Sequence, residues 1–205
     1  MEQIKLTIFS DYVCPWCYVG QGVVEELIKD QHAEVEWRPF YLRPDTPPEG
    51  MELPAYIKSH AAQTNALLKE KANSFGMEMV FSSHLPNTRL AHEATEYARQ
   101  QGKEFEFHRK VFDKFYGLGQ DIGKWEVLVA AAEEVGLNGE EMQSLVEAGT
   151  YTNIVQSEVD QAHQIGVTGV PTYVLNNRYA IVGAQPYDVF LKVLEKLKSE
   201  APSIT

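Results

Sequence analysis

The chain has 205 residues, 44% of them hydrophobic, and a formal net charge of −11 at pH 7. A chain of this length and composition is able to bury a core of its own without disulfide staples. Nucleic acids and anionic membranes are bound through clustered Lys and Arg, so the acidic net charge excludes both as expected partners. No apolar stretch approaches the length of a membrane span.

The first predicted element is a short strand over residues 4–9, where apolar and β-branched residues alternate with polar ones. A helix over about residues 15–29 follows, because apolar residues recur at helical spacing between positions 23 and 28. Proline is well tolerated in the first turn of a helix, which suits Pro15. Cys14 is therefore expected at the N-cap of this helix or next to it, and Cys17 one turn inside.

Cys14 and Cys17 are the only cysteines of the chain and form the motif Cys14-Pro15-Trp16-Cys17. Unpaired backbone N–H groups and the helix dipole favour negative charge in the first turn. The thiolate is the form that attacks a disulfide, so Cys14 is predicted to be the nucleophile. Cys17, on the inner side of the turn, is expected to be less exposed and to resolve the mixed disulfide.

Two other interpretations of this cysteine pair compete with disulfide exchange. The spacing also suits a metal ligand pair, but the chain has no second cysteine pair and its histidines form no His-x-x-x-His set, so no metal is expected. Free cysteines are also commonly inert and buried. The Pro-Trp pair between them and their place between a strand and a helix argue against that interpretation.

The remaining elements are predicted from periodicity and from turn residues. A second strand over residues 33–40 completes a βαβ unit, and a proline-rich connector covers residues 43–50. From about residue 54 to about residue 165 nearly everything is predicted to be helical, with helices over 56–75, 87–102, 105–115, 125–135, 140–148 and 151–164. Strands over 171–175 and 179–183 then predict a hairpin, followed by a helix over 186–197.

A βαβ unit, a helical block and a ββα unit predict an α/β fold. Neither terminal piece has enough strands to bury a sheet alone, so we expect the two pieces to pair in space. The predicted sheet domain consists of residues 1–43 and 166–205, and residues 44–165 form an all-helical domain inserted between its two halves.

Two segments together resemble a known family. The octapeptide SDYVCPWC at positions 10–17, with GVPT at positions 169–172, resembles the DsbA-like branch of the thioredoxin superfamily, and more closely its cytoplasmic FrnE-type oxidoreductases. Residues 86–92, 119–122 and 166–172 support the resemblance. It implies a thioredoxin fold with a helical insertion and a cis peptide bond between Val170 and Pro171 that faces the cysteine pair. The exposed backbone of Val170 would then pair with an extended substrate beside Cys14.

Further predictions concern residues next to the cysteines. Pro15 and Trp16 bear on the redox potential of the pair, and Trp16 either contacts substrate or only covers the disulfide. Asp11 is expected either to tune a thiol and relay a proton or merely to satisfy local backbone groups.

The substrate-binding prediction covers two segments. Val170, Pro171 and Thr172 are expected to contact substrate on the implied cis-proline loop. Asn87 and Arg89 are expected to face the site from the helical domain, as His92 does, although Asn87 is also a natural helix cap.

The leading functional hypothesis is a thiol–disulfide oxidoreductase that acts on protein or small-molecule thiols. The cytoplasm is its expected location, because the N-terminus lacks the charged-then-apolar run of a secretion signal. The oxidoreductase needs no metal or organic cofactor, with glutathione as a possible co-substrate. The alternative is a glutathione-dependent isomerase or transferase, because the insertion architecture resembles 2-hydroxychromene-2-carboxylate isomerases and kappa-class glutathione transferases. Those relatives typically carry serine where this chain has Cys14. A third class is a binding or holdase module without turnover.

Overall fold

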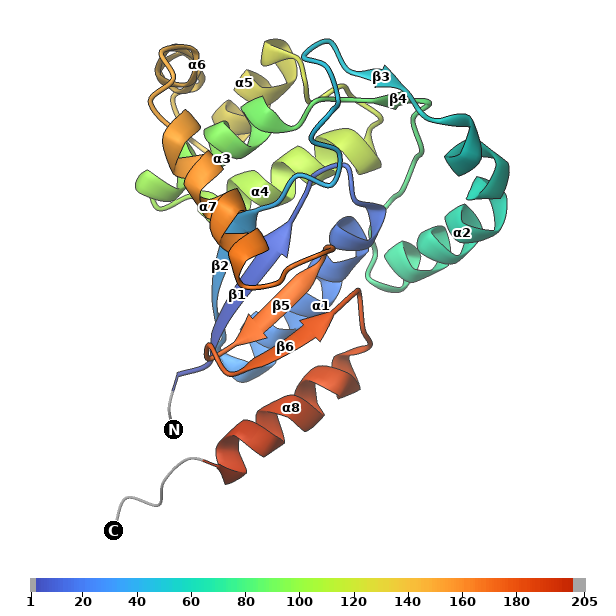
Figure 1. Ribbon diagram of the computed structural model, residues 1–205, viewed down its shortest axis with the longest axis vertical. Helices are drawn as coiled ribbons and strands as arrows, with labels where there is room; N and C mark the ends of the chain where they lie inside the picture. The colour runs from blue at the N-terminus through green and yellow to red at the C-terminus, as the bar shows by residue number, and fades with distance from the viewer. Residues whose placement is uncertain (1–2, 201–205) are drawn as a thin grey trace.

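The computed structural model describes residues 3–200. Figure 1 shows a twisted sheet with helices on both sides and a block of helices above it. In chain order the elements are β1 (Lys5–Ser10), α1 (Pro15–Gln31), β2 (Glu34–Pro39), β3 (Met51–Glu52), α2 (Ala55–Ser74), β4 (His84–Leu85), α3 (Arg89–Gln100), α4 (Glu104–Phe112), the π-helical turn η1 (Asp113–Gly117), α5 (Trp125–Glu134), α6 (Gly139–Glu147), α7 (Thr152–Gln164), β5 (Thr172–Leu175), β6 (Tyr179–Val182) and α8 (Tyr187–Ser199).

The main sheet combines the two ends of the chain. Its strand order is β2-β1-β5-β6, with β1 and β2 parallel and the other two pairings antiparallel. The predicted α/β fold and the pairing of the terminal pieces are therefore confirmed. The domain boundaries at 43/44 and 165/166 stay a prediction.

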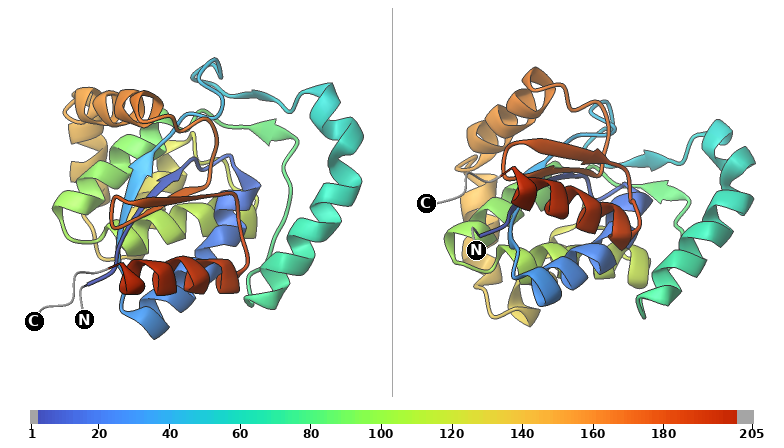
Figure 2. Two further views of the ribbon diagram at one scale, coloured as in Figure 1. Left: turned by 60° about the horizontal axis from the view of Figure 1, so that its bottom comes forward. Right: turned by 90° about the horizontal axis from the view of Figure 1, so that it is seen from below.

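The two faces of this sheet are covered differently. Helices α1 and α8 lie against one face (Figure 2), where apolar side chains of β1 and β5 meet both helices in a continuous core. Leu6 and Ile8 of β1 are fully buried there, beside Phe190 of α8. The other face meets the end of α7, where Phe9 packs near Ala162. Successive side chains of β1 point to opposite faces of the sheet, so its apolar residues lie in two separate cores.

The helical insertion shares its core with the cysteine segment. Helices α3 to α7 gather above the sheet, whereas α2 lies along the side of the molecule (Figure 1). One cluster of buried residues runs from Cys14 and Cys17 through Phe112 of α4 to Leu128 of α5. The insertion is consequently part of the wall around the cysteines rather than an appendage.

The prediction of an almost entirely helical insertion is wrong at two short segments. β3 and β4 pair antiparallel, with Met51 opposite Leu85 and Glu52 opposite His84. A two-residue ladder leaves no periodicity that a sequence pattern could detect. The predicted helix over 105–115 is also longer, because α4 continues into the π-helical turn η1. No helix within residues 3–200 is both long and apolar enough to cross a bilayer.

Candidate functional site

The cysteine pair lies where β1 passes into α1. Cys14 is the N-cap of α1, with extended backbone angles (φ −90°, ψ 111°), and Pro15 follows in the first turn. The amides of Cys17 and Tyr18 donate to the carbonyl of Cys14, at 3.0 and 3.3 Å, and so begin the helix. The Cys14 side chain makes no capping hydrogen bond. Its sulfur is therefore free to contact other groups at the positive end of the helix dipole.

Both cysteines are free thiols, and their sulfurs lie close together. The Cys14 thiol donates to the backbone carbonyl of Val170 at 3.4 Å, and the Val170–Pro171 peptide bond is cis. Burial raises the pKa of the Cys17 thiol well above its ordinary value, and a hydrogen bond to Cys14 acts in the same direction. The backbone of Asp11 opposes this shift by bonding to the Cys17 sulfur. At neutral pH Cys17 is thus a protonated thiol.

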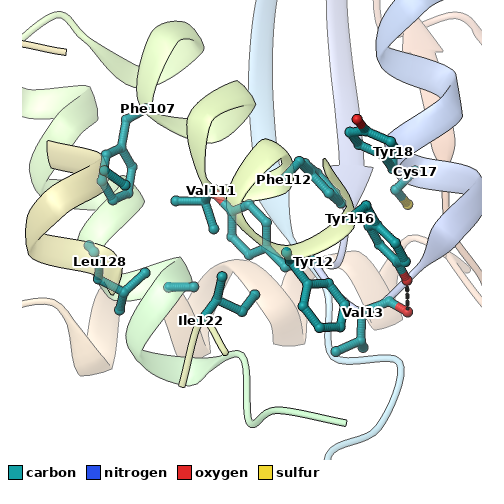
Figure 3. Packing of buried hydrophobic residues seen from close by; sticks show 14 of the residues in the cluster. Tyr12, Val13, Cys17, Tyr18, Phe107, Val111, Phe112, Tyr116, Ile122 and Leu128 are labelled. Atoms are coloured by element: carbon teal, nitrogen blue, oxygen red, sulfur yellow. Dashed lines mark hydrogen bonds between the residues drawn. The ribbon is translucent and has the colours of Figure 1, made fainter. Parts of the chain in front are cut away.

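The expected difference in exposure between the two cysteines is wrong. Cys14 is 3% exposed and Cys17 is 2% exposed, so both are buried to the same degree. The cause is the helical insertion, which packs on the segment before α1. Figure 3 shows Tyr116 of η1 pointing at Val13, and its hydroxyl donates to the Val13 carbonyl at 2.8 Å. This contact, together with Val170 on the other side, covers the first turn of α1.

A large cavity opens beside the covered thiol. It has a volume of about 450 Å³ and lies between α2, the β3–β4 ladder and the segment around Cys14. Val13 and Pro15, the two neighbours of Cys14 in the chain, line it. Most of its other lining side chains are apolar, among them Ile57, Leu68 and Phe81. The cavity thus lies next to Cys14 in the chain, although Cys14 itself does not line it.

The cis-proline loop is held by its own hydrogen bonds. The Thr172 hydroxyl donates to the Gly169 carbonyl at 2.7 Å, and the Gly183 amide donates to the Pro171 carbonyl at 2.8 Å. These bonds fix the backbone of Val170 next to Cys14. Val170 and Pro171 thus lie beside the cysteine pair and the Thr172 hydroxyl bonds within the loop, while substrate contact by these three residues stays a prediction.

The approach of this loop to α1 depends on Gly20. A Cβ atom at Gly20 would lie 2.2 Å from the Tyr173 hydroxyl oxygen. Tyr173 is 1% exposed and packs edge-on against Phe190, at 4.9 Å between ring centroids, so it has no room to move away. Only glycine fits at this position of the helix.

Gly20→Ala is therefore expected to destabilise the protein by about 1–3 kcal/mol through overpacking. Alanine normally stabilises a helix relative to glycine by about 1 kcal/mol. Gly117→Ala is the matched control, because its Cβ would meet nothing closer than 3.7 Å. Urea unfolding should show opposite signs for the two variants. Equal stabilisation by both would contradict the assigned contact.

Asp11 holds the loop after β2 in place. One of its carboxylate oxygens accepts from the Leu42 amide at 2.7 Å, and the other lies 3.4 Å from Nε2 of His92. Its carbonyl accepts from the Cys14 amide at 3.0 Å. The side chain thus bonds a backbone amide, and a role of Asp11 in tuning a thiol or relaying a proton stays a prediction. His92 belongs to this pairing with Asp11, and substrate contact by His92 stays a prediction.

Asn87 and Arg89 lie at a different pocket. The Asn87 side chain accepts from the Arg89 amide at 2.9 Å and donates to the Thr46 carbonyl at 2.6 Å. Arg89 forms an ion pair with Glu93 at 2.8 Å. Both line a polar pocket of about 350 Å³ and not the apolar cavity beside Cys14. Asn87 thus has the local role of a turn residue, and substrate contact by either residue stays a prediction.

Trp16 is half-buried and packs on the main apolar cluster, and its predicted role, substrate contact or cover of the disulfide, stays a prediction. Tyr116 and Tyr173 also lie near the cysteines but gave no signal in the sequence. Tyr116 and Tyr173 have pKa values raised well above the ordinary range, first by burial and then by the nearby cysteines. Among residues 3–200 no group of three or more His, Cys, Asp or Glu side chains is placed to hold a metal ion.

Comparisons with known proteins agree with this geometry. Residues 5–195 match the model of the DSBA-like thioredoxin domain family. The chain is 35% identical to the uncharacterized protein YwbO of Bacillus subtilis over 194 residues, which cover 93% of this chain and 96% of that protein.

Two solved structures have a similar fold. A probable DsbA oxidoreductase from Streptomyces coelicolor has a TM-score of 0.89 at 25% identity, over 99% of this chain and 93% of that one. A 2-hydroxychromene-2-carboxylate isomerase has a TM-score of 0.81 at 16% identity, over 98% of this chain and 99% of the other. With a βαβ…ββα sheet, a dithiol at the start of α1 and a family match over nearly its whole length, the chain belongs to the DSBA-like thioredoxin domain family.

Proposed function

We propose that the protein is a thiol–disulfide oxidoreductase in which Cys14 is the nucleophile and Cys17 the resolving thiol. The observation that carries the proposal is the position of Cys14, which caps α1 with a side chain that has no capping hydrogen bond. Negative charge is favoured at that end of a helix. Cys17 follows one turn later, with its sulfur hydrogen-bonded to that of Cys14.

The proposed reaction has two exchanges. The Cys14 thiolate attacks a substrate disulfide, forms a mixed disulfide and releases the first substrate thiolate. Cys17 then attacks the Cys14 sulfur, forms the Cys14–Cys17 disulfide and releases the second thiolate. The dithiol itself holds the two electrons, so the reaction uses no metal or organic cofactor. The same steps run in reverse when the protein oxidises a dithiol.

The substrate is proposed to reach Cys14 through the apolar cavity. Val13 and Pro15 line that cavity on either side of Cys14 in the sequence. The Val170 backbone, at 3.4 Å from the Cys14 sulfur, is placed to meet an extended chain next to the reacting sulfur. A disulfide with apolar neighbours, either in a peptide or in a small molecule, fits this lining best, and glutathione is a candidate co-substrate.

The reaction class is tested with the wild-type protein in two parallel assays. One follows reduction of insulin disulfides by dithiothreitol, and the other follows conjugation of glutathione to an aromatic electrophile. We expect acceleration of the first. Acceleration of conjugation alone would favour a glutathione transferase or isomerase instead, the class whose members typically carry serine at this position.

The role of the cavity is tested by placing a charge on its wall. Ala61 of α2 lines the cavity, whereas its neighbour Ala62 is exposed and does not. Ala61→Asp is expected to raise KM for an apolar peptide disulfide by roughly tenfold, since an unpaired charge near apolar surface costs at least about 1.4 kcal/mol. Ala62→Asp makes the same helix substitution and should leave KM unchanged. Equal KM values for the two variants would place the substrate elsewhere.

A further inference from the structure

A small cavity lies at the end of β1, beside Ser10, and shares no lining residue with the apolar cavity. It has about 10 Å³ of room, and on the same measure one water molecule needs about 10–15 Å³. Strands β1 and β2 and helices α3, α4 and α7 all contribute to its wall. The lining residues used below are Ser10, Trp37, His108 and Glu158.

Each of these four residues has a buried polar atom without a hydrogen-bond partner in the described part of the chain. The atoms are the Ser10 hydroxyl oxygen, Nε1 of Trp37, Nδ1 of His108 and Oε2 of Glu158. A buried polar atom without a partner costs about 1–3 kcal/mol, so four around one cavity are not expected by chance. Trp37 donates, Glu158 accepts and Ser10 does both, which is the set of partners that a bound water requires.

Ser10 links this cavity to the resolving cysteine, which does not line the cavity itself. The Ser10 side chain faces Cys17 and acts to lower the pKa of that buried thiol, although it makes no hydrogen bond of regular geometry to it. Ser10 also lines the cavity. One hydroxyl therefore faces both the sulfur and the buried polar space.

The outer end reaches solvent through Glu158. Glu158 lines the small cavity and also an open pocket of about 690 Å³ on the sheet face beside α7. Its Oε1 accepts from Arg99 at 3.0 Å and from Arg38, so Oε2 is the oxygen left for the cavity. His108 stacks on Trp37, at 3.8 Å between ring centroids, and closes the wall next to Glu158.

We propose that this cavity binds a water molecule, and that Ser10, the water and Glu158 form a proton path from Cys17 to the open pocket. The inference rests on the proposed function and assigns the route of one proton in it. As the S–S bond between Cys17 and Cys14 forms and the bond from Cys14 to the substrate sulfur breaks, the leaving sulfur takes the electron pair. The proton of Cys17 passes to the Ser10 hydroxyl, whose own proton moves to the water and on to the Glu158 carboxylate.

Burial raises the pKa of Glu158, against the opposing effect of Arg99 and Arg38, which makes this carboxylate a better proton acceptor than an exposed one. The titratable and charged groups on the cavity wall are Arg38 from β2, His92, Glu96 and Arg99 from α3, His108 from α4 and Glu158 from α7. The groups that act on the pKa of Cys17 are Cys14, Asp11 and Ser10, and Cys17 in turn raises the pKa values of Tyr116 and Tyr173. Burial holds the pKa of His108 well below its usual range, so this imidazole is neutral at pH 7.

The test separates the two exchanges in a single turnover. A substoichiometric nitrobenzoate disulfide is mixed with the reduced protein in a stopped-flow instrument, and release of its coloured thiolate is followed from pH 5.5 to pH 9. The first release reports attack by Cys14, and the second reports attack by Cys17. The variant is Ser10→Ala, which removes one hydroxyl and leaves the fold intact. Thr46→Val is the matched control, because Thr46 has another buried hydroxyl without a partner but does not line this cavity.

We expect Ser10→Ala to slow the second release by at least about tenfold near pH 6 and to leave the first release unchanged. The deficit should disappear towards pH 9, where hydroxide removes the proton directly, and Thr46→Val should match the wild type throughout. If the wild type shows the second release and Ser10→Ala does not slow it, or slows it equally at every pH, the proton path is overturned and the proposed function is not affected. Absence of a second release in the wild type would instead overturn the proposed function.

Discussion

Replacing Cys14 by serine is expected to reduce disulfide exchange to the uncatalysed background, a loss of roughly three orders of magnitude or more. Serine keeps the size of the side chain at the N-cap of α1 but presents a neutral hydroxyl, which does not attack a disulfide sulfur. The fold should be unaffected, because the Cys14 side chain makes no capping bond. Insulin reduction and thermal unfolding of the variant measure the two effects separately.

Cys17→Ser is the matched control for this substitution, and we expect it to trap the mixed disulfide instead of abolishing the first exchange. Cys14 is retained, so the first exchange should proceed and the substrate should remain attached as a mixed disulfide. Mass spectrometry of the intact protein after incubation with a peptide disulfide should show one added peptide chain. Substantial insulin reduction by Cys14→Ser, or absence of an adduct in Cys17→Ser, would contradict the assigned roles.

The second large effect is expected at Arg99, which joins the insertion to the sheet domain. Its guanidinium pairs with Glu104 at 2.9 Å and with Glu158 at 3.0 Å, and it donates to the Trp37 carbonyl. The three elements that it connects are α4, α7 and β2. The Arg99 side chain is 22% exposed and those of Glu104 and Glu158 are 15% and 9% exposed. This is a mostly buried network, in which loss of the cation leaves Glu104 without its ion-pair partner and Glu158 with Arg38 alone.

Arg99→Met is expected to destabilise the protein by about 3–5 kcal/mol at neutral pH, the usual cost of breaking a buried ion pair on one side. Arg109→Met is the control, because Arg109 pairs with Glu25 at the surface and such pairs contribute at most about 1 kcal/mol. Urea unfolding of both variants at pH 7.5 gives the comparison. Equal free energies of unfolding would contradict the central position of Arg99.

The deficit of Arg99→Met should depend on pH with a definite sign. Burial raises the pKa values of Glu104 and Glu158 in the folded protein, and Arg99 opposes that shift. A carboxyl whose folded pKa is raised binds protons more tightly in the folded state, so its stabilising contribution is present at low pH and is lost as the pH rises. Removing Arg99 raises both pKa values further. The deficit should therefore be smaller at pH 5.5 than at pH 7.5.

The sequence alone predicts the elements of the main sheet, most of the helices and the position of the dithiol, because these depend on local signals. Pro15 after Cys14 marks the start of α1, and Cys14 is its N-cap as predicted. The turn-like triplet between the last two strands predicts the hairpin, and Asn176 and Asn177 do have positive φ angles, 49° and 55°. Asparagine tolerates that region of backbone space better than most residues.

What the sequence does not predict depends on contacts between distant segments. The burial of Cys14 arises from Tyr116 and Val170, more than 100 positions away along the chain, as the contacts to Val13 and Cys14 show. The unpartnered side chains on the wall of the small cavity come from four elements, and each of them looks ordinary within its own element. Ser10 ends a strand, and His108 is one histidine on a helix. Only the packing brings their unpartnered atoms to one cavity.

Equilibration of the wild-type protein in glutathione buffers of increasing oxidation, followed by acid quenching, thiol labelling and mass spectrometry, tests the central claim most directly. The claim is that Cys14 and Cys17 interconvert reversibly between a dithiol and an intramolecular disulfide. We predict one two-electron transition in which both labels disappear together and the protein mass falls by two hydrogens. A protein that keeps both thiols at every buffer ratio, or that ends with glutathione on Cys14 and a free Cys17, would contradict it.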